Sequence, residues 1–252
     1  MTLAVIGGTG LYGLDRLKDV AEQRIPTPYS DQPVTLSRGL LNGHPTLFLA
    51  RHGTDHSVPP HRINYRANLW ALRKAGADRI IAVAAVGGIA EDLAPGRLAF
   101  PDQLIDYTWG RASSFCDDAG QPLTHIDFTE PYSAEVREQL CQAAERARVD
   151  ARVSGCYAAT QGPRLETAAE IQRLARDGCH MVGMTGMPEA ALARELEVPY
   201  ATCAVVANRA AGLGDGEGLS MEQIRHHLVT GMDQVGKLLQ AITGQASPAP
   251  PE

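Results

Sequence analysis

Short apolar runs, which predict strands, alternate along the chain with amphipathic stretches that predict helices. Strands are expected at residues 3–6, 33–37, 46–50, 79–85, 98–105, 153–158 and 201–207. Helices are expected at residues 64–75, 134–148, 166–176 and 220–242, with a short helical run after the turn 183–189. Asn42-Gly43, between the second and third strands, is typical of a β-hairpin. The alternation favours an α/β fold, a single domain over residues 1–244 with a mixed central β-sheet flanked by helices.

The ends of the chain and its composition narrow the class of protein. Residues 1–7 carry no secretory signal pattern, and no apolar run approaches the ~18 residues that span a membrane. Residues 245–252 are rich in Pro and Ala, which predicts a disordered tail. A net charge of −6 argues against a nucleic-acid-binding face. The five cysteines are scattered without a Cys-x-x-Cys pair, so we expect a reduced, cytoplasmic protein without a structural metal.

A glycine-rich turn, Gly8-x-Gly10-x-x-Gly13, follows the first strand and matches the dinucleotide-binding fingerprint letter by letter. That fingerprint also requires a parallel βαβ unit with an acidic residue at the end of the next strand. The following segment is instead rich in proline, contains Asp31, and leads into the hairpin. The backbone N–H groups of such a turn bind anions, and Thr9 adds a hydroxyl. A lone phosphate therefore fits this turn better than a dinucleotide.

Further groups suited to an anion follow other predicted strands. Arg51 follows the strand at 46–50, and a guanidinium can bind two oxygens of one phosphate. Ala84-Ala85 stands before two glycines, where small side chains and exposed backbone let a ligand approach closely. Thr185 supplies another hydroxyl. Taken alone, Arg51 could equally be a surface residue; taken with the other donors, it predicts one anion site at the strand ends.

Five segments together resemble the family of purine nucleoside phosphorylases and methylthioadenosine phosphorylases, in its trimeric branch. They are Gly7-Gly8-Thr9-Gly10-Leu11, Ala50-Arg51-His52-Gly53, Asn64-Tyr65-Arg66-Ala67-Asn68, Gln161-Gly162-Pro163-Arg164 and Gly183-Met184-Thr185-Gly186-Met187-Pro188-Glu189. The similarity runs in order over residues 3–242. It implies a homotrimer with active sites near subunit contacts, and reversible phosphorolysis of a purine nucleoside. Inorganic phosphate is then a co-substrate, and no metal or other cofactor is expected.

The resemblance also assigns roles by position. The expected phosphate-binding residues are Thr9, Arg51, His52, Ala84, Ala85 and Thr185. Met184 would pack against the ribose, Leu165 would contact the substrate, and His125 would reach a neighbouring subunit's site. No protein nucleophile is required, because phosphate itself attacks a ribosyl carbon that gains oxocarbenium character as the purine leaves. The protein positions the two reactants and stabilises the charge on the departing base.

Asn208 and Glu166 are the expected catalytic residues, and they determine which purine base the site accepts. In adenine-cleaving members that resemble this chain, Asp stands at the positions of Asn208 and Ala210. The amide of Asn208 can accept a hydrogen bond from N7–H and donate one to a 6-oxo oxygen, whereas a carboxylate would repel that oxygen. Glu166 can accept from N1–H, which hypoxanthine and guanine have and adenine lacks. The alternatives are a helix N-terminal carboxylate for Glu166 and a strand-terminating turn residue for Asn208.

Met221 and Ile224, in the last helix, determine which 5′ group of the substrate the site accepts. Ordinary purine nucleoside phosphorylases of this kind carry a histidine that bonds the 5′-hydroxyl, and its position here is matched by Ile224. Apolar residues suit a methylthio group better than a hydroxyl. Both could also be plain core residues, and a one-turn slip would bring His226 or His227 inward.

The combination of a 6-oxopurine signature and an apolar 5′ wall predicts S-methyl-5′-thioinosine as the substrate. Three alternatives within reach of the same residues stay open: a general inosine/guanosine phosphorylase, a methylthioadenosine phosphorylase and a non-catalytic nucleoside-binding protein. A dehydrogenase is a more distant alternative, based on the glycine-rich turn.

Overall fold

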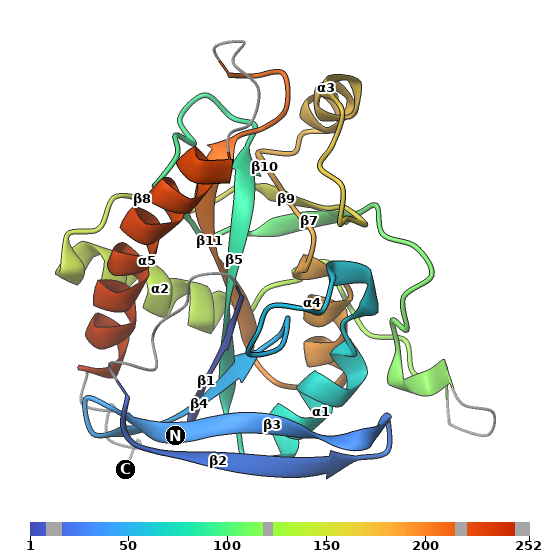
Figure 1. Cartoon of the computed structure of the whole chain (residues 1–252), viewed down its shortest axis with the longest axis vertical. Coiled ribbons are helices and arrows are strands. Elements are labelled where there is room, and N and C mark those ends of the chain that lie inside the picture. Colours follow the sequence, from blue (N-terminus) through green and yellow to red (C-terminus); the bar gives the residue numbers. More distant parts are fainter. Residues whose placement is uncertain (9–16, 118–122, 215–220, 245–252) are drawn as a thin grey trace.

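A mixed sheet runs through the centre of the fold in the computed structural model, which describes residues 1–8, 17–117, 123–214 and 221–244 (Figure 1). Its strands are β1 (Leu3–Gly7), β2 (Lys18–Thr27), β3 (Ser30–Leu41), β4 (His44–Ala50), β5 (Arg79–Gly88), β6 (Leu98–Ala99), β7 (Gln103–Asp106), β8 (Ala151–Arg152), β9 (Cys156–Ala159), β10 (Met181–Gly183) and β11 (Tyr200–Arg209). The α-helices are α1 (Tyr65–Lys74), α2 (Ala134–Ala147), α3 (Ala168–Arg176), α4 (Gly186–Glu195) and α5 (Met221–Thr243). Short 3-10 turns occupy Pro60–Arg62 and Phe115–Asp117.

Strand β5 is the axis on which the other site-bearing strands are arranged. It pairs in parallel with β1 on one side and with β11 on the other, and β1 pairs in parallel with β4. The carboxyl ends of β1, β4, β5 and β11 therefore share one edge. Strand β10 pairs antiparallel with the end of β5, Met181 opposite Gly88, so Gly183 returns toward the middle of β5. The turns after β4 and β10 consequently meet beside β5.

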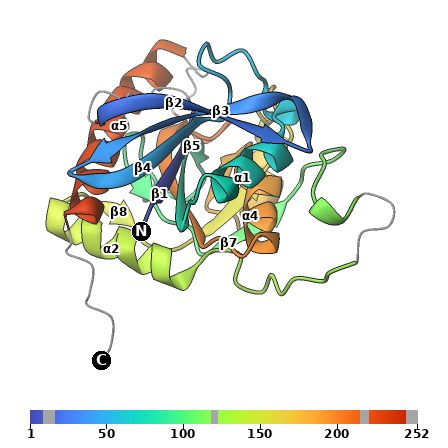
Figure 2. The ribbon, with the colours of Figure 1, turned by 90° about the horizontal axis from the view of Figure 1, so that it is seen from below.

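Two helical layers cover the sheet (Figure 2). Helices α1 and α4 bury residues such as Leu72 and Leu192 in a cluster with Ile6 and Val206 on one face. Helices α2 and α5 bury residues such as Leu140 and Leu238 on the other face. In α1 and α2 the buried positions follow the helical period that the sequence pattern indicated, whereas α4 is buried on all sides from Gly186 to Ala193. The expected α/β class with a mixed, helix-flanked sheet is confirmed.

A β-bulge interrupts the pairing of β11 with β5 close to its end. Val206 lies opposite Val86 and Asn208 lies opposite Gly87, so Ala207 is an extra residue in β11. A bulge bends a strand and redirects the side chains that follow it. Asn208 is the first residue after this shift.

Most expected elements are present, and the hairpin is confirmed: Asn42 and Gly43 both have positive φ, 50° and 81°, between β3 and β4. The single strand expected at 98–105 is wrong. It is divided into β6 and β7 because Pro101 lacks the N–H that a continuous ladder needs. Only the second half of the strand expected at 153–158 is present: β9 begins at Cys156, after Gly155 with φ 142°, and the short β8 ends at Arg152.

Two further differences concern element boundaries. The helix expected from residue 166 begins at Ala168, because Thr167 caps it and forms a capping box with Glu170. Strand β2 was not expected, since only Ile25 in it is buried and Pro26 and Pro28 stand at and just beyond its end. It is an edge strand that pairs with β3, where such a sequence is tolerated. The tail expected to be disordered, 245–252, lies outside the described residues. None of the helices in the described ranges combines the length and apolarity that crossing a bilayer requires.

Candidate active site

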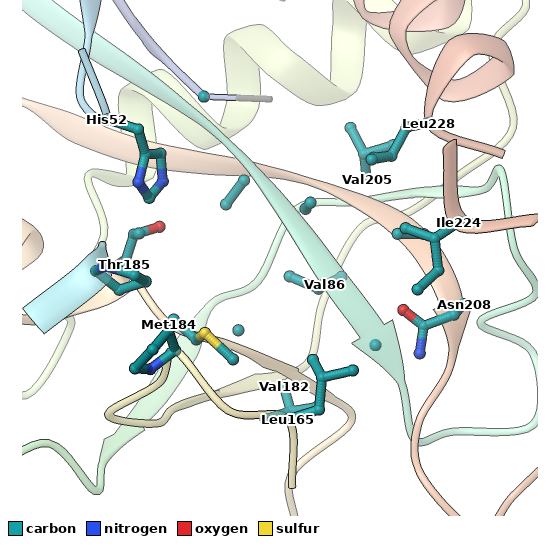
Figure 3. Close-up of a pocket in the computed structure, with 18 of the residues that line it drawn as sticks. His52, Val86, Leu165, Val182, Met184, Thr185, Val205, Asn208, Ile224 and Leu228 are labelled. Atoms are coloured by element: carbon teal, nitrogen blue, oxygen red, sulfur yellow. The ribbon is translucent and has the colours of Figure 1, made fainter. Parts of the chain in front are cut away.

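A cavity of about 500 Å³ lies where the ends of β4, β5, β10 and β11 meet helix α5 (Figure 3). The predicted site residues that line it are Arg51, His52, Ala84, Ala85, Leu165, Glu166, Met184, Thr185, Asn208, Ala210 and Ile224. A cavity of this size, mainly apolar with a few convergent polar groups, is typical of a small-molecule site.

Three predicted site residues are not placed in this cavity. Thr9 and the side chain of Met221 lie outside the described residues. His125 is exposed on the segment that follows the undescribed residues 118–122, and it does not line the cavity of its own chain. Gly8, the last described residue of the glycine-rich turn, does line it.

Arg51 enters the site already paired with a buried carboxylate. Its Nε and one terminal nitrogen donate to the two oxygens of Glu189 in α4, at 3.1 and 2.8 Å, and its other terminal nitrogen donates to the carbonyl of Val83 at 2.7 Å. Both side chains are almost fully buried. Burial would lower the pKa of the guanidinium, but the Glu189 charge outweighs it and raises that pKa. The two-nitrogen fork therefore faces Glu189, and only the remaining N–H groups of Arg51 are free for an anion.

His52 presents an unprotonated nitrogen to the cavity. Its Nδ1 lies 2.8 Å from the carbonyl oxygen of Val58, which can only accept, so Nδ1 carries the proton. Burial, reinforced by the adjacent Arg51 charge and by His56, lowers the pKa of His52 to about 4 against the opposing effect of the Val58 hydrogen bond. The ring is neutral at neutral pH, and Nε2 carries a lone pair.

The anion end of the cavity is formed by close packing around Gly8. A Cβ at Gly8 would lie 3.0 Å from Cδ2 and 3.5 Å from Nε2 of His52, and 4.0 Å from a terminal nitrogen of Arg51. Only glycine lets the backbone come this near to both side chains. In Figure 3 the His52 ring points toward the hydroxyl of Thr185 from the opposite wall. Glycine backbone, imidazole, guanidinium and hydroxyl thus converge on one small volume.

The turn that carries Thr185 is held against a buried tyrosine. Gly183 and Gly186 pack on the ring of Tyr157, where a Cβ would lie 2.2 and 2.9 Å from its atoms. The Tyr157 hydroxyl accepts the Thr185 N–H at 3.4 Å. Met184 points the other way, into the cavity, and packs over Gly162. The glycines of this turn are therefore required by contact, which explains the sequence Gly183 to Gly186.

Asn208 lies at the opposite end of the cavity from His52 (Figure 3). Its Nδ2 donates to the carbonyl oxygen of Arg209 at 2.6 Å. This hydrogen bond orients the amide and leaves Oδ1 and the second N–H available, one acceptor and one donor side by side. The bulge at Ala207 places Asn208 opposite Gly87, where a Cβ would lie 3.2 Å from a methyl group of Val182, so only glycine fits there without a shift of its neighbours.

Glu166 contributes one oriented carboxylate oxygen. Its Oε1 accepts from the hydroxyl of Thr160 at 2.6 Å, and the side chain is half-buried in the cavity wall. The alternative of a helix N-terminal carboxylate does not hold, because Glu170 is the acidic residue in the first turn of α3. Glu166 precedes the cap and faces the cavity.

Helix α5 supplies an apolar wall. Ile224, Leu228 and Met232, spaced four residues apart, all line the cavity. The one-turn slip considered from the sequence does not occur: His226 is exposed, and His227 lies 3.3 Å from the Ala207 carbonyl without lining the cavity. Figure 3 shows Ile224 beside Asn208 and remote from His52.

Arg111 was not expected at the site from the sequence, and its guanidinium contacts the backbone of cavity residue Met184. Its guanidinium donates to the backbone carbonyls of Met184 (2.8 Å), Met187 (2.5 Å), Thr160 (3.2 Å) and Gln161 (2.9 Å). It therefore joins the turn after β9 to the turn after β10. A lone arginine in a loop gives no local signal of this role. The wall formed by residues 56–60 was also missed, since it follows the recognised Arg51-His52 pair without a pattern of its own.

The arrangement separates an anion end from an end suited to a flat polar ring and an apolar group. Among the described residues, no cluster of three or more His, Cys, Asp or Glu side chains could hold a metal ion. The groups that converge are hydrogen-bond donors and acceptors; Ser57, which also lines the cavity, donates its hydroxyl to the Asp55 carboxylate at 2.8 Å. Such a site can hold and polarise two substrates.

Comparisons with known proteins agree with this geometry. The family model described as the phosphorylase superfamily matches residues 2–243. The chain is 54% identical over 224 residues to the probable S-methyl-5′-thioinosine phosphorylase of Xanthomonas campestris pv. campestris, covering 89% of this chain and 90% of that protein. It is 47% identical over 216 residues to the probable 6-oxopurine nucleoside phosphorylase of Thermococcus kodakarensis, covering 84% and 80%. The solved methylthioadenosine phosphorylase from Schistosoma mansoni in complex with adenine has a TM-score of 0.91 at 28% identity, covering 96% of this chain and 91% of that chain. This chain therefore belongs to the phosphorylase superfamily.

Proposed function

We propose that this protein catalyses the reversible phosphorolysis of S-methyl-5′-thioinosine to hypoxanthine and 5-methylthio-α-D-ribose 1-phosphate. One observation carries the proposal: the Asn208 amide and the apolar wall around Ile224 lie together at one end of the cavity, opposite the anion end at His52. An amide suits a 6-oxopurine, and an apolar wall suits a methylthio group.

The stereochemistry of a nucleoside fits this separation. In a β-nucleoside the base and the 5′ group are on the same face of the ribose, and a nucleophile that displaces the base approaches from the other face. Asn208 and Ile224 would therefore contact the base and the 5′ group, and His52 and Thr185 would hold phosphate on the far side. Met184, between the two ends in Figure 3, would pack against the sugar.

The reaction then needs only placement and charge stabilisation. Bond breaking at C1′ leaves negative charge on the purine, N7 takes up a proton from water as the base departs, and Oδ1 of Asn208 accepts a hydrogen bond from the resulting N7–H. The second N–H of Asn208 donates to O6, and the free oxygen of Glu166 accepts from N1–H. Phosphate is the nucleophile, so we infer that no metal or cofactor takes part.

The phosphate contacts are also part of the proposal. Gly8 and Ala85 offer backbone, Thr185 offers a hydroxyl, and Arg51 offers the N–H groups that Glu189 and Val83 leave free. Thr9 and Ala84 are assigned by position. Ala210 and Leu165 line the cavity beside Asn208 and Glu166 and would contact the base.

We further infer a homotrimer in the cytoplasm. His125 is exposed and does not line the cavity of its own chain, which suits a residue that completes a neighbour's site. The five cysteines are free, which suits a reducing compartment.

A general 6-oxopurine nucleoside phosphorylase is the second candidate, favoured by the relative from Thermococcus kodakarensis. It shares the base chemistry and differs at the 5′ end. Release of free base from methylthioinosine, methylthioadenosine, inosine and guanosine, each with and without phosphate, separates the possibilities. We expect phosphate-dependent turnover with kcat/KM highest for methylthioinosine. Equal values for methylthioinosine and inosine would favour the second candidate, and turnover without phosphate would contradict both.

A further inference from the structure

His52 offers the anion end an acceptor where a phosphate site usually offers donors. Its Nδ1 proton is committed to the carbonyl of Val58 at 2.8 Å, and that oxygen has no proton to give in exchange. Nε2 therefore has only a lone pair. Among the described residues no donor is hydrogen-bonded to Nε2, and the nitrogen lies 3.5 Å from where a Cβ of Gly8 would be.

The charge around His52 favours this neutral state. The Arg51 charge next to it disfavours a second positive charge on the ring, although the Glu189 carboxylate neutralises most of that charge at longer range. His56 packs against the same ring with centroids 4.5 Å apart. The side chains at this end therefore combine an ion pair of zero net charge with neutral imidazole.

A bound oxyanion must satisfy Nε2 with a proton of its own. An ionised oxygen placed against a lone pair is repelled, whereas a P–OH group can donate to it. We propose that His52 selects the protonated oxygen of the anion, so that the site accepts hydrogen phosphate and hydrogen arsenate and rejects fully deprotonated tetrahedral dianions of the same size. This inference rests on the proposed function, because it concerns the phosphate co-substrate of that reaction.

Monofluorophosphate is the sharpest probe of this idea. At neutral pH it has the charge and shape of hydrogen phosphate, with fluorine in place of the OH group. Sulfate is a second dianion without a proton, and arsenate retains one. Inhibition constants against phosphate would be measured in the phosphorolysis assay at constant ionic strength, together with arsenate-dependent turnover. We expect arsenate to replace phosphate, and sulfate and monofluorophosphate to bind at least ~10-fold more weakly than phosphate, the penalty of an unpaired buried polar group.

Two variants test the residue itself. An amide can turn its N–H toward an anion that has no proton. In His52→Asn the affinities for phosphate, sulfate and monofluorophosphate should therefore lie within about threefold of one another. Thr185→Val removes a donor that any oxyanion would use, so it should weaken all of them and keep the wild-type ratios. Both comparisons use ratios within one variant, so a general loss of activity does not obscure them.

The outcomes separate the inference from the function beneath it. No phosphate-dependent turnover by the wild-type protein overturns the proposed function. Turnover with phosphate, but sulfate and monofluorophosphate binding as tightly as phosphate, overturns only the selection by His52. That second result would mean that the ring takes up a proton when the anion binds. The wild-type measurements decide this even if His52→Asn fails to fold.

Discussion

At the scale of single residues, the chemistry of the cavity depends on which hydrogen-bonding groups are already committed to the protein. Arg51 donates two hydrogen bonds to the carboxylate of Glu189, and His52 donates its only N–H to a backbone carbonyl. Asn208 donates one N–H to the backbone carbonyl of Arg209, which leaves one N–H donor and the Oδ1 acceptor for a ligand. The hydrogen-bonding groups that are left uncommitted define the ligand. They suit an anion with an O–H group at one end of the cavity, and a ring with one donor and one acceptor at the other.

The amide at Asn208 should set the choice of base. In Asn208→Asp both oxygens accept, so they suit a 6-amino group and repel a 6-oxo group. We expect the ratio of kcat/KM for methylthioadenosine to that for methylthioinosine to rise at least ~100-fold, in line with two mismatched polar contacts. Asn208→Ser, which keeps a small polar group without a carboxylate, serves as the control and should lower both activities. An unchanged ratio in the Asp variant would mean that this residue does not recognise the substituent at position 6 of the purine.

Protonation of His52 should reduce stability in acid. Its pKa is about 4 in the folded protein and near 6.5 when unfolded, so the unfolded chain binds the proton more readily. The contribution of neutral His52 to the free energy of unfolding is therefore fully present above about pH 6.5 and is lost as the pH falls toward 4. Allowing for partial exposure, we expect a loss on the order of 1 kcal/mol between pH 7 and 5, or ~2–4 °C in Tm. Scanning calorimetry of wild type and His52→Asn at both pH values checks this, since the variant should show a smaller fall.

At the scale of elements, the register of α5 determines which side chains face the 5′ end of the cavity. Ile224, Leu228 and Met232 face inward, and Val229 faces solvent with 69% of its surface exposed. The same pattern could be seen in the sequence as an amphipathic helix, but periodicity alone left the slip toward His226 or His227 open. The packing of α5 on β11 settled it.

Placing a histidine on the inner face should restore a hydroxyl-binding group. We expect Ile224→His to raise kcat/KM for inosine relative to methylthioinosine by about 10-fold or more, the effect of one buried hydrogen bond against an apolar contact. Val229→His adds the same side chain on the outer face of the same helix and should leave the ratio unchanged. A shift of equal size in both variants would exclude a role for the inner face.

Arg111 joins two turns that carry opposite ends of the site. Its removal leaves several backbone carbonyls without a donor, at about 1–3 kcal/mol for each that stays unsatisfied. We expect Arg111→Ala to lower Tm and to reduce kcat, with guanidinium ion in the assay restoring part of the kcat. Arg164, exposed and paired with Glu170, provides a matched control in Arg164→Ala, which should change Tm and kcat little because an exposed ion pair contributes little to stability. Loss of kcat without any rescue by guanidinium would argue against a positioning role.

The sequence predicted the parts of the fold that local rules determine. The Asn42-Gly43 hairpin, the amphipathic helices and the buried β5 and β11 follow from turn chemistry and periodicity. It did not predict β2, because an exposed edge strand lacks an apolar pattern. Nor did it predict the Arg51–Glu189 pair or the contacts of Arg111, which join residues far apart in the chain through the packing of whole elements. The cavity residues were found because several of them stand at strand ends, where parallel sheets place their sites.

At the scale of the whole molecule, the expected trimer has a direct test in the sharing of sites. If His125 of one subunit completes the site of the next, His125→Ala and Asn208→Ala are each inactive, but mixed trimers contain some sites with both native residues. Random mixing of equal amounts should restore about a quarter of the wild-type activity. Mixing Glu166→Ala with Asn208→Ala should restore nothing, because both residues belong to one cavity. Absence of recovery in the first mixture would place His125 outside the site.

The bulge at Ala207 makes strand length a determinant of what the cavity recognises. Deleting that one residue would let β11 pair regularly with β5, with Asn208 still opposite Gly87 but without the local bend that now sets the direction of its amide. Every residue that contacts the base would still be encoded, yet the amide would meet the base at a different position and angle. Changes in substrate range can therefore arise here by insertion or deletion in a core strand, so attempts to re-engineer this pocket should vary the length of β11 as well as its side chains.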